Sequence, residues 1–403
     1  MKKVFKVLLT VLILLAVAFF VYVLIEKPFK KVTFSSLSEM LCDAVGVESE
    51  DPSRELLTLG VVSKNIEARE NEKLTNEEAY SIISRMYLLY SDDDKLFSDI
   101  KDSDKISTAF KKDIAGLLKD GYLEKGGALK PKALANAKKI AEIVSSIRGT
   151  DVTQEGSCYG DAEAEGNLSI KSSGVTLSNT TFLGDIILCD TPSASISLSN
   201  VTVKGKVIVR AAKNTKLTLL DGTKVVGGVY VVSSTGEATV EGDETVAFDV
   251  VSNGKVSVSG NADTVTVLDN ADITTNGTIG IVKTDGAGTI SIENGRFDTV
   301  YARSQGANIR IGQGVTGEKI AVSDGFSGST VTVSGNIETI SCKATNSVIN
   351  IKGTAVLGTL EVLEKSEKTT VLIEKRAVIE NLSNAENSGA TVIDNRSQWD
   401  GRR

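Results

Sequence analysis

The chain has 403 residues, with 45 Lys and Arg against 52 Asp and Glu, and it contains no histidine. This length suits two or three domains. The missing imidazole excludes Ser-His-Asp and Cys-His catalysis, His-ligated zinc and haem bound through a proximal histidine. The net charge of -7 argues against nucleic acid as a partner, because phosphate binding requires a basic face. Hydrophobic residues make up 41% and aromatics only 5%, which predicts a folded chain with an aliphatic core.

The N-terminal segment predicts a membrane anchor. Three lysines within the first six residues precede an uncharged apolar run from Val7 to Ile25. As a helix this run is about 28 Å long, close to the roughly 30 Å hydrocarbon core of a bilayer. A cleaved signal peptide is the alternative, because Ala16 to Ala18 fits a small-x-small cleavage pattern. We expect residues 1–31 to be a cytoplasmic stub and single-pass anchor in the cell membrane, with the bulk of the chain extracytoplasmic at the cell surface.

Residues 32–150 are predicted to form a small helical domain. Apolar residues recur at intervals of three and four, as in Phe34, Leu37 and Leu41. This spacing indicates amphipathic helices. Pro131 suits the first turn of the last of them. The predicted helices span residues 34–46, 53–62, 75–90, 105–120 and 131–147.

Two parts of this domain resemble S-layer homology (SLH) modules. Phe97 to Ile100, together with the helix end Leu117 to Leu123, looks like the opening of such a module. Leu57 to Val62, followed by Leu74 to Ala79, is similar to its second half. The resemblance covers about a quarter of the chain, as roughly two divergent copies. It implies a helical module that attaches the protein to cell-wall polysaccharide.

The resemblance also implies a ligand-binding motif at Thr75, Asn76 and Glu78. In the family a Thr-Arg pair opens a helix and belongs to the binding motif. Thr75 holds the threonine position, but Asn76 replaces the arginine and so lacks its planar, bidentate donor. The second copy has Lys130 to Lys132 there and no Thr-Arg pair. Thr75 followed by Glu78 is also a capping box, which explains both residues as a helix start without any ligand.

The residues predict no metal site and no cofactor. The acidic run Asp92 to Asp94 lacks the alternation and glycine of a calcium loop and is expected to be a solvated connection. The cysteines form no C-x-x-C pair and no zinc pattern. A bridge between Cys158 and Cys189 in an oxidising compartment and buried thiols that act as small hydrophobes are both open. The remaining cysteines are Cys42 and Cys342.

From Gly166 the pattern changes to strict alternation with Asn, Gly and Ser turns, and it repeats. The repeat length averages about 19.5 residues, which indicates a repeat array. The array spans residues 166–395. Successive repeats begin at Val175, Ile196, Leu217, Ala238, Val256, Ile273, Ile290, Ile309, Val331, Ile349, Val371 and Ala390.

Each repeat carries a second short strand after a turn that Asn or Gly supplies, because these residues tolerate positive φ. Such strands are expected at residues 207–209, 229–231, 246–250, 265–267 and 320–322. Short strands stacked about 4.8 Å apart describe a single-stranded parallel β-helix, a solenoid roughly 55 Å long with about 12 coils. An antiparallel sandwich is the alternative, but its hairpins would not keep a near-constant period. Residues 151–165 are predicted to be a linker and residues 396–403 a polar tail.

Charged and polar residues recur where the second strand of each coil ends. Asp269 and Asp285 are expected to stack one coil apart, near enough for a raised pKa or a cation site. The alternative is that such aspartates cap turns and that opposite charges pair on a solvated edge. We predict no catalytic residue on this basis. The full set is Asp190, Arg210, Ser233, Ser252, Asp269, Asp285, Arg303, Asp324, Lys343 and Glu364.

Three functions fit these features. The first is a non-catalytic, membrane-anchored protein of the bacterial cell envelope that displays the solenoid as a structural or adhesive element. The second is a carbohydrate-active lyase or hydrolase, which requires a groove of carboxylates. The third is a filament-forming protein that resembles bactofilins and exposes apolar end coils. The absence of long loops and of aromatic residues for a sugar platform argues against the second. The length of the helical region and the charged tail favour the first.

Overall fold

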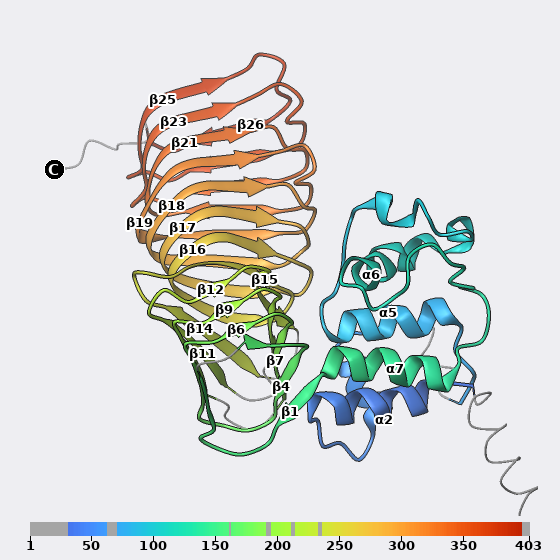
Figure 1. Cartoon of the computed structure of the whole chain (residues 1–403). Coiled ribbons are helices and arrows are strands. Elements are labelled where there is room, and N and C mark those ends of the chain that lie inside the picture. Colours follow the sequence, from blue (N-terminus) through green and yellow to red (C-terminus); the bar gives the residue numbers. More distant parts are fainter. Residues whose placement is uncertain are drawn as a thin grey trace, which may run out of the picture. The chain divides into compact units, whose positions relative to one another are not determined.

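The computed structural model describes residues 31–62, 71–160, 163–190, 195–210, 214–232 and 236–396. It divides into two compact units, one that ends at Gly149 and one that begins at Thr150 (Figure 1). The predicted anchor, Val7 to Ile25, lies outside the described residues. Within the described ranges, no helix combines the length and apolar character that crossing a membrane requires.

The first unit is helical, and five helices lie close to their predicted positions. α7 begins at Ala137 rather than near Pro131, because Asn136 caps it and accepts hydrogen bonds from the backbone of Lys138 and Lys139. Pro131 instead offers its carbonyl to the backbone N–H of Glu77. The elements are α2 (Phe34–Val45), α3 (Pro52–Thr58), α5 (Asn76–Met86), η1 (Asp94–Phe97), η2 (Ser103–Lys105), α6 (Thr108–Lys119) and α7 (Ala137–Arg148).

The second unit is a parallel β-solenoid of about 12 turns, as predicted. Its strand segments form three stacks, and Figure 1 shows the successive coils one above another. The first stack contains β2 (Cys158–Gly160), β5 (Val175–Ser178), β8 (Ser195–Ser199), β11 (Thr215–Leu220), β14 (Glu237–Gly242), the first parts of β16 (Lys255–Val267), β17 (Asp272–Thr284), β18 (Thr289–Ala302) and β19 (Asn308–Val322), and β20 (Thr330–Val333), β22 (Val348–Ile351), β24 (Thr370–Ile373) and β26 (Thr391–Asp394).

The third stack runs along the whole solenoid, whereas the second is confined to its first coils, and all of their pairings are parallel. The second consists of the short strands β3 (Glu163–Ala164), β6 (Thr181–Phe182), β9 (Thr202–Val203) and β12 (Lys224–Val225). The third contains β1 (Thr150–Val152), β4 (Leu168–Ile170), β7 (Ile186–Leu188), β10 (Val207–Arg210), β13 (Val229–Val232), β15 (Ala247–Ser252), the second parts of β16 to β19, β21 (Asn336–Cys342), β23 (Val356–Val362) and β25 (Val378–Asn384).

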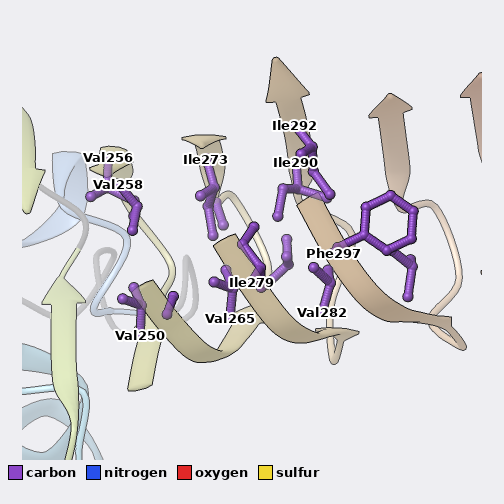
Figure 2. Close-up of a cluster of buried hydrophobic side chains, with 14 of the residues drawn as sticks. Val250, Val256, Val258, Val265, Ile273, Ile279, Val282, Ile290, Ile292 and Phe297 are labelled. Atoms are coloured by element: carbon purple, nitrogen blue, oxygen red, sulfur yellow. The ribbon is translucent and has the colours of Figure 1, made fainter. Parts of the chain in front are cut away.

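The aliphatic columns inside the coils form one continuous core. Inward side chains of the strand stacks point toward one another (Figure 2). Residues on neighbouring coils lie directly above each other because the backbone ladders are in register. One fully buried column of the third stack contains Val265, Val282, Val300, Ile320, Ile340 and Leu360.

The predicted register is confirmed for most steps between coils and is wrong for two. Leu217 lies opposite Val240 rather than Ala238. Val371 lies opposite Val392 rather than Ala390. Both errors amount to two residues. A shift of two keeps every side chain on the same face of the strand, so alternation alone cannot detect it.

The boundary between the two units also differs from the prediction. Residues 151–165 were expected to be a linker, but β1 to β3 lie there and pair in parallel with the next coil. The solenoid therefore begins at Thr150. This first coil escapes the alternation pattern because its strands are short and separated by polar turns.

Several predicted turns are bends within continuous strands. Gly260, Gly277 and Gly295 lie inside β16, β17 and β18, with φ angles of +101°, +145° and +105°. They stack directly on one another. A Cβ on Gly277 would collide with the carbonyl oxygen of Gly260. Glycine is thus required twice over, for the positive φ and for the close approach of the backbones.

We expect Gly277→Ala to lower the free energy of unfolding by about 3 kcal/mol, the combined cost of positive φ and overpacking. Gly222→Ala is the matched control, because Gly222 has φ +73° but open space around its Cβ position. Its expected cost is about 1 kcal/mol. Chemical denaturation followed by far-UV circular dichroism measures both. Equal effects would show that the stacking of glycines does not matter.

Candidate functional site

Three helices of the first unit start around one ring of backbone hydrogen bonds. The N–H of Val32 donates to the carbonyl of Ala135 (3.1 Å), Ala135 to Leu74 (2.8 Å) and Leu74 to Val32 (2.8 Å). The residue after each of these is a helix N-cap: Thr33 for α2, Asn136 for α7 and Thr75 for α5. The ring therefore sets the starting points of all three helices, including the one that carries the predicted binding motif.

Thr75 and Glu78 form the capping box that the sequence predicts. The backbone N–H of Thr75 donates to Glu78 Oε2 (2.7 Å), and that of Glu78 donates to Thr75 Oγ1 (3.4 Å). Thr75 Oγ1 also donates to Glu78 Oε2 (2.8 Å). These bonds satisfy N–H groups that a helix start leaves without intrahelical partners. The capping of α5 is therefore a sufficient structural role for both Thr75 and Glu78.

Asn76, at the position of the family's arginine, holds two parts of the chain together. Its Nδ2 donates to the carbonyl oxygens of Leu129 (3.2 Å) and Lys130 (2.9 Å). The carboxylate of Asp102 accepts hydrogen bonds from the N–H groups of the same two residues, each at 2.8 Å. The segment at Leu129 and Lys130 is thus held from both sides. The three predicted site residues lie together, and each one contributes to this framework.

Glu77, which lies between the predicted site residues, was not itself predicted to have a role. It is buried at the start of α5, only 4% exposed. Its carboxylate accepts hydrogen bonds from the N–H and Oγ of Ser107 (3.0 Å each) and from Lys132 Nζ (2.5 Å). An acidic residue in a first helical turn usually faces water and interacts with the helix dipole, so the sequence carried no signal for its burial.

Within the hydrogen-bond ring, Asn136 and not Lys130 to Lys132 holds the place on α7 that Thr75 holds on α5. An asparagine directly before an amphipathic run is a recognised N-cap signal, and it would have identified this position. Neither Thr75 nor Asn136 is followed by an arginine.

A partly buried carboxylate connects α5 to α6. Asp113 Oδ2 accepts hydrogen bonds from Ser81 Oγ (2.5 Å) and Arg85 Nε (2.8 Å). Burial raises the pKa of Asp113, and the charge of Arg85 and the two hydrogen bonds oppose that rise. Because the folded-state pKa lies above its ordinary value, the contribution of this group to stability is largest at acid pH and falls as the pH rises.

On the solenoid, Asp269 and Asp285 do not stack as predicted. Val267 pairs with Thr284, which places Asp285 opposite Leu268 and leaves Asp269 one position further on. Asp269 Oδ1 accepts a hydrogen bond from the N–H of Ala287 (2.7 Å), and Asp285 Oδ1 accepts one from Arg303 Nε (2.9 Å). The described residues contain no group of three or more Cys, Asp or Glu that could hold a metal ion.

One pair from the predicted solvated edge is instead buried. Arg210 Nε lies 2.7 Å from Asp190 Oδ2, and the two side chains are 0% and 1% exposed. The neighbouring Cys189 is a free, buried thiol, so its bridge to Cys158 does not form. Burial raises the pKa of the Cys189 thiol to about 12. Cys342 is a free, buried thiol as well, and Cys42 is also buried, in agreement with the interpretation as small hydrophobes.

Comparisons of the chain with protein-family models, with curated proteins and with solved structures gave no match. The S-layer resemblance therefore stays a prediction from the residues that suggested it.

We expect Asn76→Ala to lower the free energy of unfolding by about 1 kcal/mol, since the carbonyls of Leu129 and Lys130 lose their donor. Asn76→Asp keeps the shape but places a carboxylate against these carbonyls, so it should cost more. Thermal or chemical unfolding measures both effects. Unchanged stability of Asn76→Ala together with lost retention on purified cell wall would instead assign Asn76 to ligand contact.

Arg210→Met should cost about 3–5 kcal/mol of stability, because it leaves the carboxylate of Asp190 buried without its cation. The double variant Asp190→Leu with Arg210→Met removes both charges and should recover most of that loss. Urea denaturation of the two variants and of the native chain tests this. A double variant as unstable as the single one would mean that packing, and not charge, decides the site.

Proposed function

We propose that the chain is a single-pass, membrane-anchored protein of the bacterial cell envelope. In it an SLH-like helical unit and the β-solenoid form a non-catalytic structural or adhesive surface element. The observation that carries the proposal is the continuous aliphatic core of the solenoid. Val265, Val282 and Val300 and their successors stack without interruption from coil to coil. Such a stack is stiff and holds its outer surface at a fixed distance from its starting point.

The strand-end acids support a structural role. Asp269 is bound to a backbone N–H of the next coil, Asp285 to Arg303, and Asp190 to Arg210. Each carboxylate therefore connects neighbouring coils, and the side chain of Asp190 is only 1% exposed. A lyase or hydrolase would need acids that face a common substrate position.

The charged side chains on the outside of the solenoid are consistent with a surface that faces water along its length. Opposite charges on neighbouring coils pair at its surface, as between Lys216 and Glu241 (2.6 Å) and between Lys255 and Glu237 (2.9 Å). Exposed pairs of this kind contribute little to stability. They do give the coils a polar exterior. The SLH resemblance supports cell-wall polysaccharide as a partner of the helical unit, although Asn76 replaces the arginine of the family motif.

Protease accessibility on whole cells tests the location. We expect external protease to degrade the solenoid without lysis, and the chain to stay with the membrane fraction after washing at high salt. A cytoplasmic protein digested only after lysis is the control. Protection of the solenoid in intact cells would contradict the surface location and favour a cytoplasmic filament. Release by high salt would contradict the anchor.

A further inference from the structure

The last coil of the solenoid has open strand edges. In the described part of the chain, β25 pairs with β23 alone and β26 pairs with β24 alone. Residues 380–384 of β25 are all exposed. Arg396 covers only the start of this edge, where its Nη1 donates to the carbonyl of Ile379 (3.1 Å).

The aliphatic core is also open at this end. Leu382 continues the buried column above Leu360, in direct register. Leu360 is 0% exposed, whereas Leu382 is 37% exposed. At the other end of the solenoid, Val152 in the first coil is 2% exposed. Among the described residues, the last coil thus exposes part of its core column, whereas Val152 of the first coil is buried.

The open edge carries little that would prevent pairing. Proteins usually protect such edges with lysine, proline or a bulge. Residues 380–384 contain neither lysine nor proline, and Glu380 is their only charge. In an antiparallel pairing centred on Leu382, Glu380 of one copy lies opposite Asn384 of the other. No like charges face each other.

We propose that two copies of the chain join end to end through their last coils, with β25 of each copy paired antiparallel to β25 of the other. The surface is suited to this occupant because coil-on-coil stacking is already the interface that builds the solenoid. A two-fold pairing uses the same open end of both copies and closes, so it yields a dimer and not a filament. The inference rests on the solenoid alone and is independent of the proposed location.

The mass of the full chain in mild detergent tests the dimer. We expect two chains per particle for the native protein. Leu382→Asp should weaken the dimer on the order of a hundredfold, because each copy loses an apolar contact and gains a buried charge. Leu183→Asp is the matched control, since Leu183 is 42% exposed and lies far from the last coil in sequence. It should leave the dimer intact, and circular dichroism confirms that both variants fold.

Cross-linking locates the contact. Asn381→Cys in one copy should link to the same residue of the other through a short bismaleimide, while Asn276→Cys, exposed in the middle of the rod, should not. A native chain of single mass at all concentrations would overturn the proposal, as would a dimer that survives Leu382→Asp. A dimer that forms only after removal of residues 397–403 would assign the open end to the chain's own tail, and would overturn it as well.

Discussion

The register between neighbouring coils is the constraint on which this structure depends. Each inward Val, Ile or Leu is buried only because the coil above and the coil below place an aliphatic side chain at the same point. The backbone ladders set that point, and the side chains in turn fix the ladders, because a shift of one residue would turn the core outward. Glycines such as Gly277 allow the chain to bend between two stacks without leaving this register.

Charged side chains in both units serve the same purpose of fixing backbone segments. Glu77 and Asp102 hold loop backbone and Lys132 around the start of α5. In the solenoid unit, the buried side chains of Asp190 and Arg210 neutralise each other. A buried charge is costly unless it is paired, so these groups make alternative packings unfavourable. Acids in this chain that resemble candidate sites are therefore better understood as parts of the framework.

The period of the sequence was sufficient to predict the solenoid and the number of its coils, because alternation and turn residues recur in every repeat. It was insufficient for the steps from Leu217 and Val371, where a shift of two residues leaves the pattern unchanged. The burial of Arg210 could not be predicted either, because the local sequence pattern does not show which residues cover the end of a strand. In the helical unit the cap at Thr75 was predictable from adjacent residues. The clamp by Asn76 joins residues more than fifty positions apart and was not.

The stacked glycines have a consequence for how such a chain changes over evolutionary time. Between Gly260, Gly277 and Gly295 the coils superimpose almost residue for residue. A genetic duplication or deletion that runs from one of these glycines to the next would add or remove one whole coil. The coils on either side of the change would still match in register. The solenoid can thus become longer or shorter by one coil at a time, and its aliphatic core needs no other change. The length of the solenoid can then evolve through the number of its coils, while the structure of each coil stays the same.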